Sequence, residues 1–496
     1  MKLAIKDMDI TTGGTLIVIL NKKDADVMDL HPLDRILIRR NSHKTVAVLD
    51  VTTNARTTPP GCVGCFEEVL TKLGAKHNDA VEVTYAKKPE SIEFIRQKLD
   101  GEDLSGEKID VIVDDVVRDE LTESEVSYFV AACYVHGNSD KETVAMTKSI
   151  VDHGDRVDLG KRVVLDKHCT GGVAGNRTSL SLVPIILAAG LCMPKTSSRS
   201  ITSPAGTADA MEVLAPVTFP AKRMESIARE VGGFLCWGGG ANLASADDKL
   251  IKVRNALSLD PEGMLLSSIL AKKAAVGASH VLIDIPIGPH TKIKTRSEAK
   301  HLQRHFESIG HKLGMRCHVM LTDGSQPIGR GIGPALEARD ALYILTRDPR
   351  RPMDLERKVL LMASMLLKIA GKKDPDRLAC ALLDSGKAYA KMKEIIAAQG
   401  GNPLIHPDKI PVGQFEYTVT AQQHGKIMLV HNRIISHIAR IAGAPVDKGA
   451  GVCLHHHVGD KVKKGQALFT IHAESREKLG FAREIANKTS PVLVNF

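Results

Sequence analysis

Short runs of alternating apolar and polar residues dominate the first 84 positions of the chain. Four of them are TLIVIL (15–20), DRILIRR (34–40), KTVAVLDV (44–51) and AVEVTY (80–85). A period of two residues is typical of half-buried β-strands. The pattern therefore predicts a strand-rich module over residues 1–84.

Beyond Pro89 the apolar residues recur every three to four positions, which is the period of amphipathic helices. The predicted helices are SIEFIRQKL (91–99), LTESEVSYFVAACYV (121–135) and KETVAMTKSIVDHG (141–154). Thr122 and Glu125 have the spacing of a capping box, which marks a helix start. Together with a later helical insertion, these segments predict a helical domain over residues 85–158 and 250–275.

Strands and helices then alternate, which is typical of an α/β domain. The predicted strands are RVVLD (162–166), MPKTSS (193–198) and HVLIDIPI (280–287), and the predicted helices are TSLSLVPIILAAG (178–190), GTADAMEVLA (206–215) and AKRMESIAREVG (221–232). This α/β domain covers residues 159–249 and 276–404. Short strands with turn residues predict a small β-rich domain over residues 405–496. The expected fold class is multidomain α/β.

The chain has 496 residues and a formal net charge of +9. A basic balance suits nucleic acid and small anionic substrates alike. The basic residues are scattered, and one Trp and six Tyr leave few rings on which bases could stack. We therefore expect small anions as ligands and no nucleic acid. A nucleic-acid-binding protein is kept as the alternative from another functional class.

Nine cysteines, an odd number, fit a reducing compartment. Cys62 and Cys65 form one CxxC pair without the second half of a zinc site, which leaves a packed loop or a redox pair open. The segment MKLAIKDMDI lacks the apolar core of a signal peptide. The longest apolar run contains Pro184 and is too short to cross a bilayer. We expect a cytoplasmic protein with no membrane partner.

The stretch KHCTGGVAGNRTSL (167–180) joins a predicted strand to a predicted helix. A glycine-rich turn at a helix start directs backbone N–H groups to one place, where the helix dipole adds positive potential, and such places bind phosphate. Lys167 adds a full charge, and Thr170, Thr178 and Ser179 add hydroxyl donors. The stretch therefore predicts an anion site rather than a simple helix cap.

A second polar loop, TSSRSITSPAGTAD (196–209), also follows a predicted strand and precedes a helix. Loops at the same ends of neighbouring parallel strands face each other across one crevice, so we expect the two loops to share a ligand. The sequence has no GxxxxGK[ST], GxGxxG or HExxH motif and no carboxylate cluster with metal spacing. We therefore expect phosphate chemistry without a metal or an organic cofactor.

These two loops, the helical insertion and the C-terminal VGDKVKKGQAL (458–468) resemble the thymidine/pyrimidine nucleoside phosphorylase family, whose signatures are KHSTGG…TSL and SSRSIT…GTAD. The resemblance covers residues 94–474. The GGVxGN form of the first loop and the N-terminal module are similar to the archaeal AMP phosphorylase branch. The resemblance implies phosphorolysis of AMP, with CMP and UMP as further candidates, to free base and ribose 1,5-bisphosphate. It also implies that this product feeds a RuBisCO pathway.

The resemblance implies roles for single residues. Substrate-binding positions are Gly172, Ser198, Arg199, Ser200, Ile201, Thr202, Ser203 and Thr207. Positions that bind the attacking phosphate are Lys167, Ser179 and Ser197. Cys169 replaces the family's serine, and a thiol is a weak donor. His168 is expected either to orient the loop or to touch the base.

Asp260, in SLDPEG, matches the family's proton donor to the leaving base. From the residues alone, an Asp before Pro261 favours a helix N-cap, and the resemblance adds the role of proton donor. Ser268 matches a substrate-binding serine on the same predicted helix. Arg254 and Lys272 resemble the residues that read the base in thymidine enzymes, although the gap from Arg254 to Ser268 is one residue shorter here.

Lys292, in IPIGPHTKIKT (285–295), matches a residue that contacts AMP. Nucleoside enzymes of the family have no lysine in this loop, so the resemblance implies a substrate with a 5′-phosphate. From the residues alone, a solvated turn is an equal interpretation. A nucleoside phosphorylase and a magnesium-dependent phosphoribosyltransferase remain alternatives. The family further implies a homodimer or a larger homo-oligomer.

Overall fold

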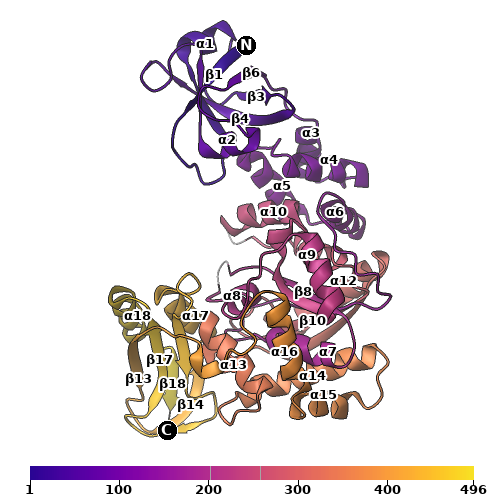
Figure 1. The fold of residues 1–496 in the computed structure, drawn as a ribbon, viewed down its shortest axis with the longest axis vertical. Helices are drawn as coiled ribbons and strands as arrows, with labels where there is room; N and C mark the ends of the chain where they lie inside the picture. Colours follow the sequence, from indigo (N-terminus) through magenta and orange to yellow (C-terminus); the bar gives the residue numbers. More distant parts are fainter. Residues whose placement is uncertain (201–202, 257–258, 496) are drawn as a thin grey trace. The chain divides into compact units, whose positions relative to one another are not determined.

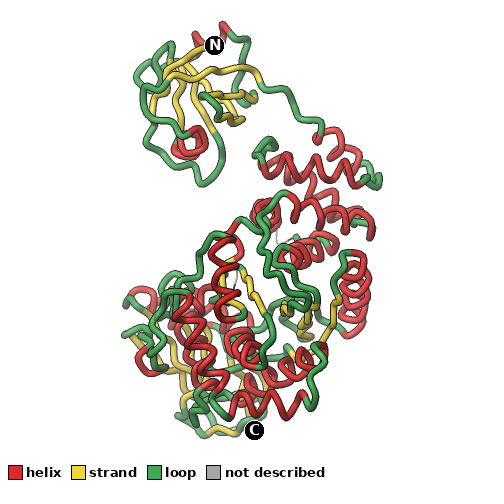
Figure 2. The backbone as a smooth tube through the Cα atoms, turned by 45° about the vertical axis from the view of Figure 1, so that its right-hand side comes forward, coloured by secondary structure: helices red, strands yellow, loops and turns green. Residues whose placement is uncertain are grey.

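The computed structural model describes residues 1–200, 203–256 and 259–495. The chain forms two compact units, Met1–His153 with Ser245–Ser267 and Gly154–Ala244 with Ser268–Phe496. Figure 1 labels their elements, and Figure 2 distinguishes helices from strands. Among the described residues, no helix is long and apolar enough to span a membrane.

The first unit begins with a closed barrel of order β1-β5-β2-β4-β3-β6, drawn in indigo in Figure 1. Alternate side chains such as Ile5, Val18 and Ile36 are fully buried inside it, so the predicted strand-rich module is confirmed. The elements are β1 (Lys2–Asp7), β2 (Ile17–Asn21), α1 (Lys22–Val27), β3 (Arg35–Arg40), β4 (His43–Thr52), β5 (Cys62–Cys65), α2 (Glu67–Leu73) and β6 (Ala80–Tyr85).

The two cysteines of the CxxC pair lie in β5 rather than in a packed loop, and both thiols are free. The loop expectation was wrong because residues Cys62–Cys65 pair with β1. Burial, aided by Asp7, raises the pKa of Cys65 to about 12. Its thiol is therefore protonated at neutral pH and is a poor nucleophile.

The first unit continues with helices α3 (Ser91–Leu99), α4 (Gly106–Val117), α5 (Glu123–His136), α6 (Asp140–Asp152) and α10 (Ser245–Ala256). The predicted capping box is present, since Thr122 and Glu125 bond each other's backbone N–H groups. α4 was not among the predicted helices, although Ile109, Ile112 and Val116 bury one of its faces.

The second unit contains a three-stranded parallel sheet of order β11-β10-β7 and a separate parallel pair, β8 and β9. The strands are β7 (Leu165–Cys169), β8 (Met193–Ser197), β9 (Gly233–Trp237), β10 (His280–Ile287) and β11 (Arg316–Asp323). β8 and β10 lie where the sequence predicts them. β7 begins three residues later than expected, because Lys167 and Cys169 pair with Leu282 and Asp284 of β10. Lys167, His168 and Cys169 are therefore strand residues rather than loop residues.

Helices surround these strands in Figure 2. They are α7 (Ser179–Ala188), α8 (Thr207–Glu212), α9 (Ala221–Val231), α12 (Arg296–Lys312), α13 (Pro334–Leu345), α14 (Met353–Ile369), α15 (Pro375–Asp384) and α16 (Lys387–Ala398), with 3₁₀ turns η1 (Gly238–Ala241) and η2 (Pro407–Lys409). Helix α11 (Glu262–Ala274) begins in the first unit and ends in the second. α7 packs on β8 and β9, whereas α12 packs on β10 and β11. The predicted helices α7, α8 and α9 are confirmed.

The C-terminal part of this unit has two small antiparallel sheets of order β12-β15-β17-β13 and β16-β14-β18. The strands are β12 (Gly331–Ile332), β13 (Phe415–Thr420), β14 (Gly425–Val430), β15 (Gly451–Leu454), β16 (Lys461–Val462), β17 (Ala467–Ala473) and β18 (Val492–Asn495). Two unpredicted helices, α17 (Asn432–Ile441) and α18 (Arg476–Lys488), pack on each other and on these sheets. The multidomain α/β class is confirmed.

Candidate active site

A cavity of about 320 Å³ opens in the second unit at the carboxyl ends of β7 and β8. Among the described residues its wall has seven cationic side chains and no carboxylate. The cations are Lys167, Arg177, Lys195, Arg199, Lys272, Lys273 and Lys292. The hydroxyl groups are those of Ser179, Thr196, Ser197, Ser198, Ser200, Ser203 and Thr207. A wall rich in cations and donors, and free of acids, suits a bound anion.

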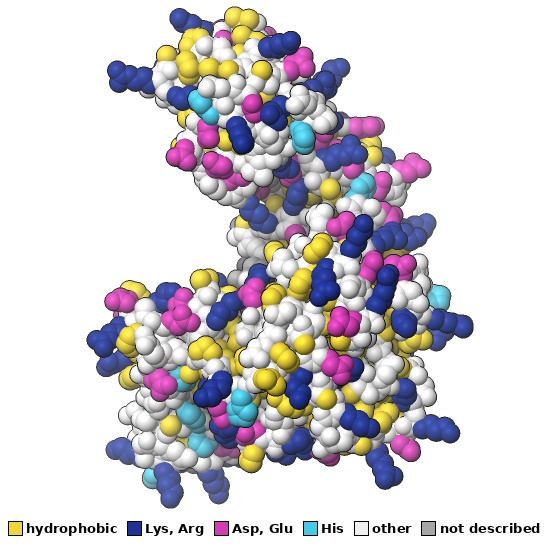
Figure 3. All heavy atoms as spheres, viewed as in Figure 1, with side chains coloured by type: hydrophobic (Ala, Val, Ile, Leu, Met, Phe, Trp, Pro, Cys, Tyr) yellow, Lys and Arg dark blue, Asp and Glu magenta, His cyan; other side chains and the backbone are white. Residues whose placement is uncertain are grey.

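The basic side chains are distributed differently on the outer surface. On the face shown in Figure 3, Lys and Arg side chains are interspersed with Asp and Glu. This face has no continuous basic stripe of the kind that follows a nucleic-acid backbone. The concentration of positive charge is therefore a property of the cavity rather than of this surface.

The two polar loops predicted to share a ligand both line the cavity, at residues 169–179 and 197–207. The strands before them, β7 and β8, contact each other as the prediction of neighbouring strands requires, but they belong to different sheets. Leu165 nevertheless donates its backbone N–H to the carbonyl of Cys192 (2.9 Å). This bond keeps β7 beside the segment that enters β8.

Carboxylates of α8 hold the hydroxyl-rich loop. Asp209 accepts the backbone N–H groups of Ser200 (2.7 Å) and Gly206 (2.8 Å). Glu212 accepts two N–H groups of Arg199 (2.5 and 2.7 Å). The guanidinium of Arg199 is thus engaged on both terminal nitrogens, and it shapes the loop as well as adding charge to the wall.

Arg177 joins the two loops to each other. Its Nη2 donates to the carbonyl of Ala205 (2.8 Å), and its Nε donates to Glu337, whose side chain is fully buried. Across the cavity, Thr196 has a buried hydroxyl with no hydrogen-bond partner among the described residues. An unpaired buried hydroxyl costs about 1–3 kcal/mol, so this group favours a ligand that accepts its hydrogen bond.

Buried carboxylates pair with lysines of the cationic wall. Lys273 lies 2.7 Å from Asp166, and Lys167 lies 3.8 Å from Asp284. Burial alone would raise the pKa of Asp284, but Lys167 and Lys358 bring that pKa below its ordinary value. These two aspartates let several lysines enter one small volume, which unpaired cations could not do.

Burial lowers the pKa of two lysines of the wall, so a bound anion would stabilise their charged form. It lowers the pKa of Lys167, and it lowers the pKa of Lys195 well below the ordinary lysine value with help from neighbouring Lys273. A bound dianion would raise both pKa values again, because it stabilises the protonated ammonium groups. Anion binding is therefore coupled to proton uptake.

His168 and Cys169 are uncharged groups of the wall. Burial, with Lys273 as the next cause, lowers the pKa of His168 well below its ordinary value. Burial, with Asp284 next, raises the pKa of the Cys169 thiol. The Sγ of Cys169 accepts hydrogen bonds from the Gly171 N–H (3.4 Å) and from Asn176 Nδ2 (3.2 Å). Cys169 thus orients the glycine loop instead of supplying charge.

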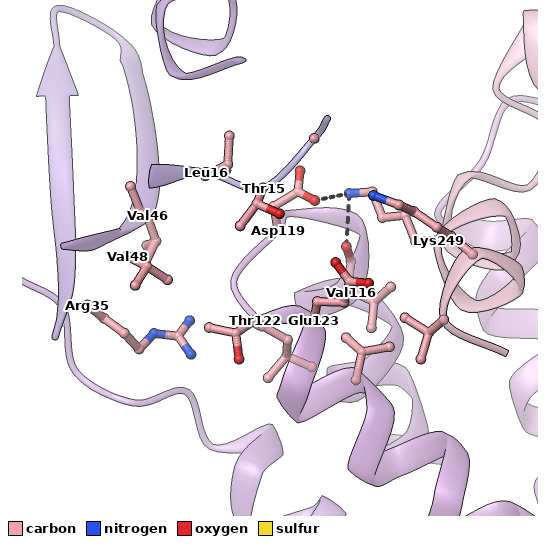
Figure 4. A pocket seen from close by; sticks show the side chains of 16 residues that line it. Thr15, Leu16, Arg35, Val46, Val48, Val116, Asp119, Thr122, Glu123 and Lys249 are labelled. Atoms are coloured by element: carbon pink, nitrogen blue, oxygen red, sulfur yellow. Dashed lines mark hydrogen bonds and ion pairs between the residues drawn. The ribbon is translucent and has the colours of Figure 1, made fainter. Parts of the chain in front are cut away.

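Another cavity, of about 310 Å³, lies in the first unit between the barrel and α4, α5 and α10 (Figure 4). Its lining is largely aliphatic. Lys249 donates to the Val116 carbonyl (3.0 Å) and to Asp119 (2.6 Å), and Arg35 pairs with Glu125 (2.6 Å). Because Asp119 and Glu123 line this cavity together with its cations, it is less suited to an anion than the cavity between the two polar loops.

Three family models match consecutive parts of the chain. They are the helical bundle domain of a glycosyl transferase family (residues 92–154), the a/b domain of that family (161–389) and the pyrimidine nucleoside phosphorylase C-terminal domain (427–492). The chain is 43% identical to the AMP phosphorylase of Methanosarcina acetivorans, covering 100% of this chain and 97% of that relative. It is 42% identical to the AMP phosphorylase of Pyrococcus furiosus, covering 100% and 98%. The chain belongs to the AMP phosphorylase branch of the thymidine/pyrimidine nucleoside phosphorylase family.

A relative with a different name has nearly the same sequence identity to the chain, and a solved structure shares its fold. A putative thymidine phosphorylase of Legionella pneumophila is 42% identical over 93% of this chain and 88% of that relative. Anthranilate phosphoribosyltransferase of Thermus thermophilus matches with a TM-score of 0.52 and 20% identity, covering 62% of this chain and 98% of that one. The latter likeness shows a shared fold. The choice between nucleotide and nucleoside depends on the site itself.

Most positions implied by the family resemblance line the anion cavity: Lys167, Gly172, Ser179, Ser197, Ser198, Arg199, Ser200, Ser203, Thr207, Lys272 and Lys292. Ile201 and Thr202 lie outside the described residues. Ser268 is buried in α11 and is not among the residues that line the cavity. Its role as a substrate contact stays a prediction.

Asp260 and Arg254 belong to the first unit, and their roles also stay predictions. Asp260 is exposed and precedes α11. Arg254 is 5% exposed, and its Nη2 lies 3.9 Å from Asp247. Its Nε and Nη1 are buried without a hydrogen-bond partner among the described residues. These two donors are suited to a ligand with acceptor atoms, as a nucleobase has.

The family resemblance did not indicate Lys195, Lys273 or Arg177, although all three line the cavity. A signal for Lys195 exists, since a lysine interrupts the buried strand MPKTS. Lysines are seldom buried without a charged partner or ligand. Arg177 and Lys273 have no comparable signal, because a basic residue in a loop or on a helix is usually solvated.

Proposed function

We propose that the protein cleaves AMP with inorganic phosphate, releasing adenine and ribose 1,5-bisphosphate. The observation that carries the proposal is the acid-free cationic wall, built from the two loops that characterise the family. Phosphate and AMP are both anions, so one cationic site lowers the repulsion between them as they approach. CMP and UMP are further candidate substrates. The pathway that consumes the ribose product stays a prediction.

In the proposed reaction an oxygen of phosphate forms a bond to C1′ of the ribose. The bond between C1′ and the base nitrogen breaks, and its electron pair leaves with the base. Lys167 and Lys195 neutralise charge on the phosphate, and they and Thr196 donate hydrogen bonds to it. Asp260 gives a proton to the departing base, as general acid catalysis requires. Arg254 donates its Nε–H and Nη1–H groups to acceptor atoms of the base.

The test is phosphate-dependent release of base from AMP, adenosine and thymidine, measured in parallel with EDTA present. Turnover of AMP that far exceeds turnover of both nucleosides supports the proposal. The second candidate function, nucleoside phosphorolysis, is favoured by the Legionella relative. Equal or faster turnover of adenosine or thymidine would establish that function instead. Loss of all turnover in EDTA, restored by magnesium, would favour a phosphoribosyltransferase.

We also propose that the protein is a homodimer or a larger homo-oligomer. The supporting observation is α5, which leaves Tyr128, Tyr134 and Val135 57–70% exposed. Tyr128 and Val135 are seven residues apart and share one helix face. Large exposed apolar groups on one helix are typical of a self-association surface. Light scattering should give at least twice the 53.6 kDa chain mass, and Tyr128→Glu should reduce that mass.

A further inference from the structure

The second unit has another cavity, of about 650 Å³, which adjoins the anion cavity and is the second cavity of this unit. The two cavities share wall residues Gly172, Val173, Arg177, Ser203 and Lys292. They therefore meet at the glycine loop and at the loop that carries Lys292. A ligand could place one anionic group in each cavity and lie across this junction.

One face of α17 forms the far wall of the second cavity. Arg433, Ser436, His437 and Arg440 all line it. They are spaced at i, i+3, i+4 and i+7, which places them on one side of a helix. The opposite side, including Ile435 and Ile438, is fully buried in the C-terminal core. Burial of that side fixes the direction in which the basic side points.

The charged side chains that line this second cavity are mostly cations. Its cations are Arg177, Lys292, Arg433 and Arg440, and Glu337 is its one carboxylate among the described residues. Glu337 already bonds Arg177. The helix sequence NRIISHIARI contains no Asp or Glu, whereas solvated helix faces ordinarily mix both signs. The excess of cations favours an anionic ligand.

Direct contacts fix the position of α17 relative to the glycine loop and the loop that carries Lys292. Asn432, at its first turn, is 1% exposed and accepts the N–H of Ala174 in the glycine loop (3.0 Å). The same side chain donates to the carbonyl of Gly324 (3.1 Å). His431 stacks on His290, two residues before Lys292, with ring centroids 3.7 Å apart. The basic face is thus fixed relative to both loops that bound the junction.

We propose that Arg433, His437 and Arg440 bind the 5′-phosphate of the substrate and so select nucleotides over nucleosides. The inference rests on the proposed function and names the part of the protein that decides its substrate class. A 5′-phosphate is largely a dianion at neutral pH, and it repels the attacking phosphate. Two separate cationic cavities keep the two phosphates apart while each is neutralised. Lys292, at the junction, serves both.

The experiment compares the wild-type protein with the double variant Arg433→Gln, Arg440→Gln. Steady-state kinetics are measured with AMP, with adenosine and with varied inorganic phosphate, and binding of ribose 5-phosphate is measured by calorimetry. Losing charge-assisted hydrogen bonds from both arginines should raise the KM for AMP and the Kd for ribose 5-phosphate at least about tenfold. The KM for phosphate and the kcat/KM for adenosine should change by less than about twofold.

Lys464→Gln is the matched control, because Lys464 is exposed, belongs to the same C-terminal part and lines neither cavity. The double variant Arg433→Lys, Arg440→Lys retains the charge and should recover part of the AMP affinity. Unchanged KM for AMP and unchanged Kd for ribose 5-phosphate in the glutamine variant would overturn the inference. Equal losses with AMP and adenosine would also overturn it, since they would indicate a structural role.

The inference and the proposed function fail in distinguishable ways. If the wild-type protein turns over AMP and the glutamine variant is unaffected, the α17 site is wrong and AMP phosphorolysis stands. If the wild-type protein ignores AMP, the proposed function is wrong. Ribose 5-phosphate binding that is lost in the glutamine variant would still support an α17 phosphate site in that case.

Discussion

The backbone of Gly172 lies directly against Thr291, the residue before Lys292. A Cβ added to Gly172 would be 2.6 Å from the Cα of Thr291 and 3.0 Å from the backbone nitrogen of Lys292. Gly172 also has a φ of +93°, which side chains with a Cβ rarely adopt. The absence of a side chain therefore brings the glycine loop and the Lys292 loop together at the junction of the two cavities.

Replacing Gly172 with alanine should displace the Lys292 loop. We expect kcat/KM for AMP to fall about tenfold to a hundredfold, because the added methyl collides with backbone atoms that cannot move independently. Gly171→Ala is the matched control: Gly171 has a φ of +95° but no atom within 4 Å of an added Cβ. It carries the backbone strain without the collision. Similar kinetic losses in both variants would show that strain alone matters.

Asp209→Asn should loosen the hydroxyl-rich loop. Both backbone N–H groups donate to Oδ2 of Asp209, and Arg199 Nη1 donates to Oδ1 (3.4 Å). An asparagine accepts the backbone bonds without a negative charge, and its NH₂ then faces the guanidinium of Arg199. We expect the KM for phosphate to rise roughly tenfold, with a modest loss of thermal stability. Asp158→Asn, at an exposed Asp that accepts from Gly160 (2.9 Å), should leave the KM unchanged. An unaffected KM for phosphate in Asp209→Asn would show that this carboxylate does not contribute to phosphate binding.

Anion binding should weaken as the pH rises, because the lowered pKa of Lys195 makes it lose its proton at a lower pH than an ordinary lysine. Sulfate is a suitable probe, since it stays a dianion and its own ionisation does not interfere. Its inhibition constant should increase as the pH rises toward the ordinary lysine pKa, and Lys195→Met should flatten the profile. A flat profile in the wild-type protein would mean that Lys195 is charged throughout.

Stability without an anion should depend on pH in the opposite sense. The unfolded chain binds a proton at Lys195 up to the ordinary lysine pKa, whereas the folded chain loses it earlier. Since the unfolded state then binds more protons, the free energy of unfolding should rise with pH between the lowered and the ordinary pKa. Calorimetric unfolding with and without sulfate checks this: saturating sulfate should reduce the slope. An unchanged slope would contradict the coupling.

Asp260→Asn should reduce kcat about a hundredfold or more while KM for AMP changes less than about threefold. Asparagine caps a helix as well as aspartate does, so the variant tests the proton donor without removing a cap. A normal kcat with a raised KM would assign Asp260 to binding or to helix capping.

Local sequence predicted the N-terminal strands, helices α3 and α5 to α9, and the two polar loops. Alternation predicted the strands of the N-terminal module, and the capping box predicted the start of α5, because both signals depend on residues a few positions apart. The glycine loop was predictable as an anion site for the same reason: its lysine, glycines and hydroxyls are contiguous. The β7 boundary was wrong because pairing with β10 draws the polar residues Lys167 and Cys169 into a strand.

Only the tertiary structure determined which charged side chains lie close together. Lys195 from β8, Lys273 from α11 and Arg177 from the glycine loop are far apart in the chain, and packing brings them to one wall. Their proximity is possible because buried carboxylates pair with cations of the wall: Asp166 with Lys273, Glu337 with Arg177, and Asp284 with Lys167. The basic face of α17 likewise acquires its direction from burial of the opposite face against the C-terminal sheets. Sequence spacing specifies elements and contiguous motifs, whereas convergence of charges depends on long-range packing that no local pattern encodes.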